Sequence, residues 1–230
     1  MNEAAIPKHI GFILDGNRRW AVDNGLPKLV GHKKGYENLK TIADECFSRG
    51  IGIVSTYIFS TENWNRELEE VNYLMDLALK LFKKDLNELM DKDIKVVVSG
   101  SREKLSEKII KAIDSTVSKT ANNKKGTINI CFNYGGQSEI ADAVAKIIES
   151  KADASQITTE LIRNNLYQPE LPPVDYIIRT SGEKRLSNFL LWDSAYAELE
   201  FVSAHWPAFS SQDLDLALAE YANRKRRFGK

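Results

Sequence analysis

The chain has 230 residues, of which 43% are hydrophobic and 28% are charged. This composition is typical of a globular protein and excludes a disordered chain. Lysine plus arginine and aspartate plus glutamate number 32 each, so the whole molecule has no net charge that would attract nucleic acid. We therefore expect one domain over residues 1–230, in which any binding of anions is local.

Cysteine usage and hydropathy indicate where the protein works. Cys46 and Cys131 are far apart in the sequence and lack metal-ligand spacing, which favours two reduced, buried thiols. The first eight residues contain no basic segment followed by a long apolar run, and no stretch of about 18 apolar residues occurs in the chain. We expect a cytoplasmic protein, which a lipid product could still draw to a membrane surface.

Short apolar runs alternate with longer segments of helical periodicity, which is typical of strands joined by crossover helices. The expected strands are residues 9–14, 53–59, 94–99, 127–132, 174–178 and 198–202. The expected helices are residues 35–49, 68–90, 102–121 and 138–150. The predicted fold class is therefore α/β, with a mostly parallel central sheet of about six strands flanked by helices.

The first expected strand is followed by an aspartate, a glycine and a pair of arginines that open a further expected helix. Ligands of open α/β sheets bind at the carboxyl ends of the strands. Gly16 allows a ligand to approach the backbone, and the amides of the helix's first turn favour anions. Asp15 is thus a candidate ligand for Mg²⁺ on a diphosphate, and Arg19 a candidate to pair with the diphosphate directly. In the alternative, Asp15 caps the helix while Arg18 and Arg19 form a solvated face.

The second expected strand leads into a loop that combines polar, aromatic and cationic side chains, residues 57–66. A turn that serves only shape favours glycine, proline and aspartate, whereas this loop contains Asn63, Trp64 and Arg66. The composition favours a recognition surface. In the alternative, Trp64 packs into the core and Asn63 caps the next helix.

A third polar segment, residues 178–189, follows the fifth expected strand. Arg179, Arg185 and the Ser187 hydroxyl surround one glycine and can bind a diphosphate, which carries several negative charges. In the alternative, the arginines form a surface ion-pair cluster with Glu183.

Two carboxylates lie on the last expected strand. Alternation places Glu198 and Glu200 on the same side of that strand. Either one is a candidate to complete a metal site, within one chain or together with a second subunit.

A rival interpretation is a phosphatase that uses an aspartate after a buried first strand as its nucleophile. Asp15 has the required placement. That chemistry usually has a second acid two residues later, however, and Asn17 stands there. The sequence therefore favours diphosphate binding by Asp15 over a phosphatase.

Taken together, these segments resemble the cis-prenyltransferase family, and most closely its bacterial undecaprenyl diphosphate synthases. The matching segments lie in one order along nearly the whole chain: residues 9–21, 31–35, 57–66, 133–136, 178–192, 195–201 and 226–229. The resemblance implies a Mg²⁺-dependent homodimer with an apolar tunnel for the growing prenyl chain. It also implies condensation of isopentenyl diphosphate with an allylic diphosphate, farnesyl diphosphate by expectation, to a long-chain product such as undecaprenyl diphosphate.

The resemblance implies a role for each matching residue. Asp15 is implied to bind the metal beside the allylic diphosphate, Glu198 to be the second metal ligand, and Asn63 to lie near the proton that is lost. The residues implied to bind the allylic substrate are Gly16, Asn17, Arg18, Arg19, Trp20, Lys28 and His32. The substrate-binding residues around Asn63 are Ser60, Thr61, Glu62, Trp64 and Arg66. Those implied to bind isopentenyl diphosphate are Arg179, Arg185, Leu186 and Ser187.

Several positions differ from the usual bacterial pattern. Arg18 replaces a second glycine, Lys28 and Gln137 each replace an arginine, and Lys184 replaces a histidine. Lysine keeps the charge of arginine but loses its planar fork, so a contact of Lys28 with diphosphate is weaker than that of arginine.

Product length is expected to depend on the depth of the tunnel, which several side chains set. Ile58 is bulkier than the residue that commonly stands at that strand end. If Ile58 faces the tunnel it shortens the product, and if it faces the core it only packs. The alternatives in function are a short- or medium-chain synthase, or a non-catalytic partner subunit, which would be expected to lack the phosphate-binding residues.

Overall fold

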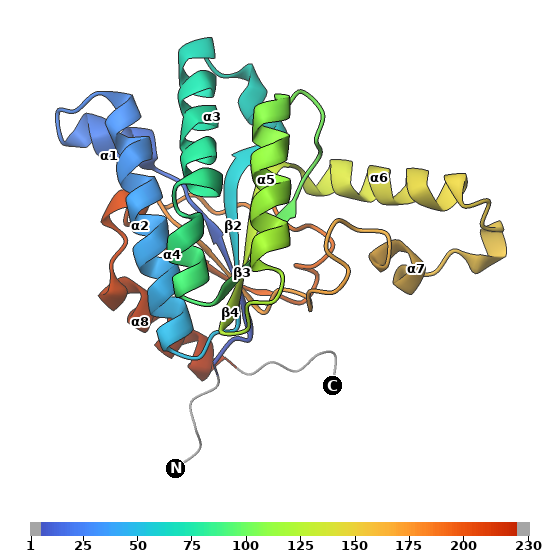
Figure 1. Cartoon of the computed structure of the whole chain (residues 1–230). Coiled ribbons are helices and arrows are strands. Elements are labelled where there is room, and N and C mark those ends of the chain that lie inside the picture. Colours follow the sequence, from blue (N-terminus) through green and yellow to red (C-terminus); the bar gives the residue numbers. More distant parts are fainter. Residues whose placement is uncertain (1–5, 225–230) are drawn as a thin grey trace.

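The computed structural model of the chain describes residues 6–224; the ends of the predicted domain and the predicted motif at 226–229 lie outside the described residues. Its centre is a sheet with the strand order β3-β4-β2-β1-β5-β6, in which all neighbouring strands are parallel (Figure 1). The strands are β1 (His9–Ile13), β2 (Ile53–Ser60), β3 (Ile94–Ser99), β4 (Gly126–Tyr134), β5 (Tyr176–Arg179) and β6 (Glu198–Phe201). The predicted α/β fold with six parallel strands is confirmed.

Helices connect the strands. They are α1 (Asn17–Asp23), α2 (Lys28–Ser48), α3 (Leu68–Lys83), α4 (Leu86–Asp91), α5 (Glu107–Thr120), α6 (Gly136–Glu149), α7 (Thr159–Arg163) and α8 (Ser211–Asn223), with short 3₁₀ helices η1 (Thr61–Asn65), η2 (Ala154–Gln156) and η3 (Trp206–Ala208). Within residues 6–224, no helix is long and apolar enough to cross a membrane.

The predicted helices over residues 68–90 and 102–121 differ from the structure in the following ways. The segment predicted as one helix over residues 68–90 forms α3 and α4, which are separated at Lys84 and Asp85. Asp85 is buried and accepts a hydrogen bond from Tyr36 of α2, so a tertiary contact ends the helical run. Helix α5 begins at Glu107, not at residue 102, because the Ser106 hydroxyl caps it by accepting from the Ile109 N–H.

Helix α2 begins at Lys28, about two turns before its predicted start at Gly35, because glycines interrupt its apolar periodicity. Gly31 lies inside the helix where α1 crosses it, and a Cβ atom there would lie 1.9 Å from the backbone oxygen of Asn17. The glycine therefore allows α1 and α2 to approach each other closely, at some cost in helix propensity.

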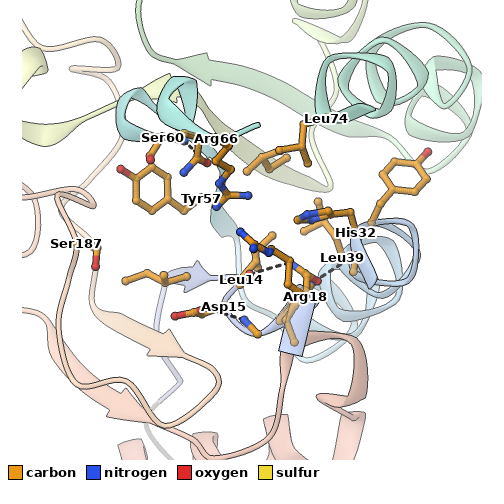
Figure 2. A pocket seen from close by; sticks show the side chains of 18 of the residues that line it. Leu14, Asp15, Arg18, His32, Leu39, Tyr57, Ser60, Arg66, Leu74 and Ser187 are labelled. Atoms are coloured by element: carbon orange, nitrogen blue, oxygen red, sulfur yellow. Dashed lines mark hydrogen bonds between the residues drawn. The ribbon is translucent and has the colours of Figure 1, made fainter. Parts of the chain in front are cut away.

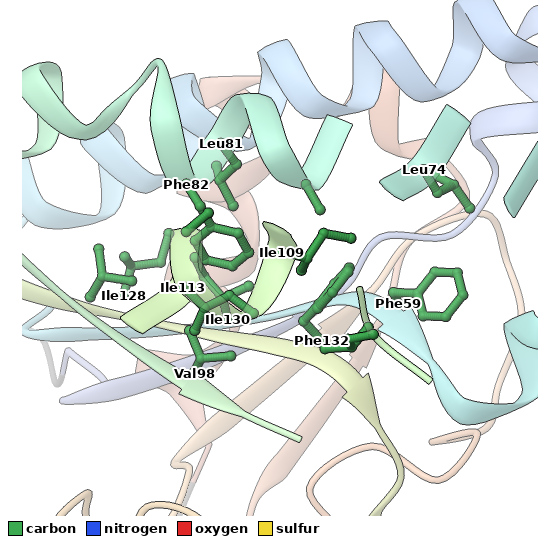
Figure 3. Close-up of a cluster of buried hydrophobic side chains, with 14 of the residues drawn as sticks. Phe59, Leu74, Leu81, Phe82, Val98, Ile109, Ile113, Ile128, Ile130 and Phe132 are labelled. Carbon is green, nitrogen blue, oxygen red and sulfur yellow. The ribbon is translucent and has the colours of Figure 1, made fainter. Parts of the chain in front are cut away.

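One face of the sheet carries the main apolar core, which is covered by α2, α3, α5 and α8. Figure 3 shows its larger part, where Ile128, Ile130 and Phe132 of β4 pack against Phe82 of α3 and Ile113 of α5. Full burial of each such side chain stabilises the fold by about 1.5–3 kcal/mol. This core fixes the position of α2 and α3 above the sheet.

The opposite face carries a row of hydrogen-bonded polar side chains beside a smaller apolar cluster. His9 Nε2 lies 2.7 Å from the Ser55 hydroxyl oxygen, Asn129 donates to the same hydroxyl over 3.0 Å, and Ser99 donates to Asn129 over 2.9 Å. Because each side chain in the row has a partner, its burial is tolerated. Cys131 is buried on this face, and both cysteines are free and buried, as predicted. Helices α6 and α7 extend away from the other helices (Figure 1).

The order of strands changes direction at β1, with β2 on one side of β1 and β5 on the other. Open α/β sheets bind ligands in the crevice outside such a point. Ile13 of β1 is in register with Arg179 of β5, so the two strands end side by side. Asp15 follows shortly after, and the fold thus brings Asp15 next to a residue 164 positions away.

Candidate active site

A cavity of about 1160 Å³ opens at this edge of the sheet (Figure 2). Polar and charged side chains from the segments that follow β1, β2 and β5 line one part of it. Apolar side chains line another part: Ile58 of β2, Leu39 of α2, and Leu74, Leu77, Ala78 and Leu81 of α3. In Figure 2, Leu74 lies across the cavity from Asp15. The cavity therefore suits a ligand with a charged head and an apolar tail.

Asp15 is held between two arginines in the polar part of the cavity. Arg179 Nη2 donates to Asp15 Oδ2 over 2.8 Å, and Arg19 Nη2 donates to Asp15 Oδ1 over 3.0 Å. Burial alone would raise the pKa of this carboxyl group. The hydrogen bonds and charges of Arg179 and Arg19 outweigh burial, however, and hold the pKa of Asp15 below its ordinary value. Asp15 is therefore ionised at neutral pH.

Arg179 is nearly buried, with 5% of its side chain exposed. Its Nη1 donates to the Ser187 hydroxyl over 2.7 Å and also to the backbone carbonyl of Arg185. Its Nε is buried and has no hydrogen-bond partner among the described residues. Arg179 also lines the cavity, where its fixed positive charge is suited to attract an anion that enters.

Arg19 and Arg185 share the carboxylate of Glu183. Arg19 Nη1 lies 3.0 Å from Glu183 Oε1, and Arg185 Nη1 lies 2.6 Å from Glu183 Oε2. The Arg185 side chain is 58% exposed and is not part of the cavity lining. For Arg185 the structure therefore matches the alternative prediction, an ion-pair cluster with Glu183, whereas Arg19 and Arg179 line the cavity.

The turn after Asp15 requires glycine. Gly16 has a left-handed backbone conformation, with φ of 96°. A Cβ atom at this position would lie 2.5 Å from the Ser181 hydroxyl oxygen and 2.6 Å from His205 Nδ1. The Gly16 N–H donates to Asp15 Oδ1 over 2.7 Å, so the turn closes on the carboxylate.

Two arginines and a histidine surround a carboxylate of α3. Glu70 Oε1 accepts from Arg66 over 2.7 Å and lies 3.0 Å from His32 Nε2, and Glu70 Oε2 lies 3.5 Å from Arg18. Burial alone would raise the pKa of Glu70, but Arg66, His32 and Arg18 lower it below its ordinary value. Burial lowers the pKa of His32 more than Glu70 raises it, so His32 is neutral at pH 7. Helices α1, α2 and α3 are joined through this cluster.

The loop after β2 forms η1, and its first turn is closed by Asn63. The Asn63 side-chain oxygen accepts from the Ser60 N–H over 3.1 Å, which leaves the amide NH₂ group available to a ligand. Ser60, Glu62 and Asn63 line the cavity. Trp64 does not: its Nε1 donates to Asn133 over 2.8 Å, and its ring packs against the core. The structure thus matches the alternative prediction for Trp64.

The structure brings most of the predicted substrate-binding residues to one cavity. Those in the lining are Asp15, Gly16, Asn17, Arg18, Arg19, Lys28, His32, Ser60, Glu62, Asn63, Arg66, Arg179 and Ser187. Those outside it are Trp20, Thr61, Trp64, Arg185, Leu186 and Glu198. Leu186 packs against the smaller apolar cluster of the sheet. The roles of all these residues toward substrates stay predictions.

Glu198 lies at the other end of the sheet from Asp15. It pairs with Tyr176, which pairs with Ile10 near the start of β1. Asp15 lies five residues beyond Ile10, which corresponds to roughly 16 Å along the strands at about 3.3 Å per residue. Glu198 also forms an ion pair with Arg224 at 3.3 Å. Glu198 and Asp15 of one chain therefore cannot hold one metal ion, and the predicted metal role of Glu198 requires a second copy.

The Asp15 carboxylate alone could serve as the protein ligand of a magnesium ion. Among residues 6–224, no three His, Cys, Asp or Glu side chains gather into a metal-binding cluster. Mg²⁺ is commonly bound by one or two carboxylates, with waters and phosphate oxygens as the other ligands. An ionised carboxylate at the wall of a polar cavity, such as Asp15, can supply this single protein ligand.

Ile58 lies at an irregularity of β2. Tyr57 pairs with Cys131 and Phe59 with Phe132, so β2 contains one extra residue at this point. Ile58 lines the cavity and also packs against the two apolar clusters of the helix-covered face. Ile58 therefore packs into the core, as one of the two predicted placements has it, and it also borders the cavity. Its role in limiting a tunnel stays a prediction.

Glu70 and Asn188 are among the residues at the site that the predicted set lacks. The signal for Glu70 is its position four residues after Arg66 at the start of a helix, where side chains meet. Asn188 has a left-handed φ of 68° and donates to Glu62 over 2.9 Å, while its own side-chain oxygen accepts from the Gln137 N–H over 2.8 Å. Asparagine next to Ser187 is the signal for such a turn.

Comparison with known proteins identifies relatives whose names fit a cavity for a ligand with a charged head and an apolar tail. A family model described as putative undecaprenyl diphosphate synthase matches residues 13–229. An isoprenyl transferase of Thermotoga maritima is 43% identical over 226 residues, which cover 97% of this chain and 97% of the relative. An isoprenyl transferase of Fusobacterium nucleatum subsp. nucleatum is 44% identical over 227 residues, which cover 99% of this chain and 97% of the relative.

Two solved structures share the fold over nearly their full length. Lavandulyl diphosphate synthase from Lavandula x intermedia, in complex with dimethylallyl diphosphate, has a TM-score of 0.92 at 31% identity and covers 98% of this chain and 99% of its own. A probable undecaprenyl diphosphate synthase from Campylobacter jejuni has a TM-score of 0.83 at 29% identity and covers all of both chains.

The fold, the cation-lined cavity and these relatives define an enzyme that transfers prenyl groups. More narrowly, the chain belongs to the undecaprenyl diphosphate synthase family, which confirms the resemblance found in its sequence.

Proposed function

We propose that the chain condenses isopentenyl diphosphate with an allylic diphosphate, with farnesyl diphosphate as the primer. The product is a long-chain cis-polyprenyl diphosphate such as undecaprenyl diphosphate, and diphosphate is released. One observation carries the proposal: ionised Asp15 lies between Arg19 and Arg179 in the polar part of a cavity whose other part is apolar.

The proposed reaction separates charge, and the cations of the site act on that charge. When the allylic C–O bond breaks, its electron pair leaves with the diphosphate, and Arg19 and Arg179 stabilise the leaving group. The isopentenyl double bond then forms the new C–C bond to the allylic carbon. Loss of a proton from the isopentenyl unit creates the new cis double bond.

Mg²⁺ is the proposed cofactor, and Asp15 is the residue that would hold it. When bound, the ion supplies further charge stabilisation to the leaving diphosphate. Arg19 and Arg179 keep the Asp15 carboxylate ionised and oriented toward the cavity, so their role extends to preparing this ligand.

Asn63 is proposed to act near the proton that is lost. A side-chain amide is a poor base, so we assign to Asn63 the positioning of a proton acceptor, diphosphate or water. Its side-chain oxygen is already bonded to the Ser60 N–H, and its NH₂ group is the part that remains for this task.

The apolar part of the cavity is proposed as the start of a channel for the growing hydrocarbon chain. The depth of this channel would decide between a long-chain and a short- or medium-chain product, because each added unit requires more apolar space. A homodimer, contact with a membrane surface at product release and a cytoplasmic location remain parts of the proposal.

The test measures which inorganic product the purified chain releases, diphosphate from prenyl transfer or phosphate from an aryl phosphate. With Mg²⁺, farnesyl diphosphate and isopentenyl diphosphate, we expect release of inorganic diphosphate that requires both substrates and falls at least 100-fold in Asp15→Asn. Lys111→Ala, on the exposed side of α5, is the control and should match the unaltered chain. Release of inorganic phosphate from an aryl phosphate, without dependence on isopentenyl diphosphate, would favour the phosphatase instead. No turnover by the chain alone would favour the non-catalytic subunit.

A further inference from the structure

A hydrogen-bonded chain of three side chains lies directly behind the Asp15 turn. Ser181 Oγ lies 2.6 Å from His205 Nδ1, and His205 Nε2 lies 3.0 Å from Asp23 Oδ2. The three residues come from separate segments: the loop after β5, the segment before η3, and the end of α1. The contact between Asp23 and His205 joins positions 182 residues apart, so it ties together parts of the chain that only the fold brings near.

This chain does not have the properties of a nucleophilic triad. Ser181 is 7% exposed and its hydroxyl packs against Gly16, so a substrate carbonyl has no access to it. Asp23 is exposed, whereas the carboxylate that orients a catalytic histidine is buried. The geometry indicates a structural connection.

The connection surrounds the turn that carries Asp15. The two segments that hold Ser181 and His205 also bind the Asp15 backbone carbonyl, which accepts from the Thr180 hydroxyl over 2.7 Å and from the Trp206 N–H over 3.0 Å. Arg19 donates to the backbone carbonyl of Ser181 over 3.3 Å. His205 is therefore connected to Arg19 through Ser181, and to Asp15 through its chain neighbour Trp206. A substitution of His205 should shift both residues.

The other side-chain ties of helix α1 to the edge of the sheet come from its first turn, where Asn17 donates to Leu14 and Arg19 donates to Asp15 and Ser181. The helix has seven residues, no side-chain cap at its start, and Ala21 as its buried residue. It nevertheless carries Arg18 and Arg19, which line the cavity. The Asp23–His205 contact holds the end of this helix against the segment before η3. His205 in turn contacts Ser181 in the loop that follows β5, two residues after Arg179.

The contact with His205 also fixes the position of the negatively charged Asp23 carboxylate. Asp23 lines the cavity and lies four residues after Arg19, so both side chains lie on one face of α1. An unrestrained carboxylate at that place would compete with a diphosphate for Arg19. With His205 as its partner, Asp23 is held at the imidazole ring.

We propose that His205, through Ser181 and Asp23, is a positioning residue for the allylic diphosphate. It fixes α1 against the loop after β5, and so keeps Asp15 and Arg19 aligned with Arg179. This inference rests on the proposed function and adds to it three residues that none of the predicted motif roles includes.

The two contacts of His205 can be tested separately. His205→Ala removes both contacts, and each hydrogen bond of this kind is worth a factor of a few in a binding constant. The variant should therefore raise the KM for farnesyl diphosphate about tenfold, with kcat and the KM for isopentenyl diphosphate within about twofold. His205→Asn retains a polar atom near Nδ1 and His205→Gln one near Nε2, so each should restore part of the loss.

Ser181 provides a second set of variants. Ser181→Ala removes the hydroxyl, and Ser181→Gly removes it while easing the positive φ of 79°. Both should raise the same KM, because the hydroxyl and not the backbone makes the contact. Since Ser181 and His205 act as one unit, Ser181→Ala combined with His205→Ala should be no worse than His205→Ala alone. Lys111→Ala serves as the unaffected control.

Two kinetic results would overturn the inference. One is an unchanged KM for farnesyl diphosphate in His205→Ala. The other is a fall in total activity that matches the fraction of unfolded protein, measured by urea unfolding, because such a fall would show only a loss of folded enzyme. Direct titration of farnesyl diphosphate into each protein separates this inference from the proposed function. If the unaltered chain forms no product, the proposed function fails, yet tenfold weaker binding by His205→Ala still supports the positioning role, and equal or absent binding in both proteins contradicts it.

Discussion

At the scale of single residues, the site is organised by three carboxylates that divide its cations among them. Asp15 pairs with Arg19 and Arg179, and Glu183 pairs with Arg185 and also with Arg19. Glu70 pairs with Arg18 and Arg66. Exposed ion pairs of this kind contribute little to stability and can be exchanged for a bound anion. Arg179 differs, because it is nearly buried and is held by Asp15 and Ser187 in a fixed position.

Glu70 gives the first prediction at this scale. Glu70→Gln should lower kcat/KM at least tenfold, because Arg66 and Arg18 lose the charge that aligns them. The free energy of unfolding should fall by only about 1 kcal/mol, because Arg18 and Arg66 are 47% and 32% exposed and water screens them. Steady-state kinetics and urea unfolding of the same preparation measure both quantities. A stability loss without a kinetic one would contradict the proposed alignment.

Asn63 gives the second prediction. Asn63→Ala should lower kcat more than it changes either KM, by about 100-fold if Asn63 orients the proton acceptor. Asn63→Asp keeps the oxygen that accepts from the Ser60 N–H but loses the NH₂ donor, so it should keep the loop and still lose turnover. Wild-type turnover in either variant would remove the proposed role.

At the scale of elements, strands were more predictable than helix ends. The residues of β3 agree with the predicted range, and the other strands differ at their ends by at most two residues, because buried parallel strands appear as short apolar runs. The ends of the helices depend on tertiary contacts between residues far apart in the chain, which the local sequence pattern does not predict. Asp85 ends α3 through its bond to Tyr36, and Gly31 lies inside α2 because Asn17 packs on it.

The packing of α2 and α3 gives a prediction about product length. Leu39 and Leu81 line the main cavity and also a small second void of about 40 Å³ further along α2 and α3. Leu81→Ala should join the two spaces and lengthen the product by at least one isoprene unit. Ala43→Leu, which fills the second void, should reverse this change in the double variant.

Ile58 and Leu216 complete the design of this test. Ile58→Ala should also lengthen the products, since Ile58 lines the main cavity at the bulge of β2. Leu216→Ala, at an exposed position of α8, is the matched control and should leave the product distribution unchanged. Products are separated by chain length, and an unaltered distribution in both Leu81→Ala and Ile58→Ala would show that these side chains do not limit the channel.

At the scale of the whole molecule, the sequence predicts which segments form the site but not how their side chains pair. Asp15, Asn63 and Arg179 follow three strands of one parallel sheet, whose carboxyl ends meet at one edge, so their proximity is predictable. The pairing of Glu70 with Arg18 and of His205 with Ser181 depends on how α1, α3 and the loops cross above that edge. No local pattern specifies those crossings.

The buried polar row of the sheet gives a prediction about the whole fold. Burial lowers the pKa of His9, so the folded chain favours the neutral ring, whereas the unfolded chain binds a proton near the ordinary pKa of about 6.5. The stabilising contribution of His9 is therefore complete above pH 6.5 and is lost as the pH falls below it. His9→Gln should show a weaker decline in unfolding free energy between pH 7.5 and 5.5 than the unaltered chain, measured in urea. Equal slopes would contradict a neutral, buried His9.

The central claim is that cations at the ends of β1 and β5 bind diphosphates while the apolar space along α2 and α3 holds a growing chain. The most direct test incubates the purified protein with Mg²⁺, farnesyl diphosphate and labelled isopentenyl diphosphate, and separates the extracted products by length and double-bond geometry. We predict a series of labelled cis-prenyl products that ends near the undecaprenyl length. Failure to transfer label to any prenyl product longer than the primer would contradict the account.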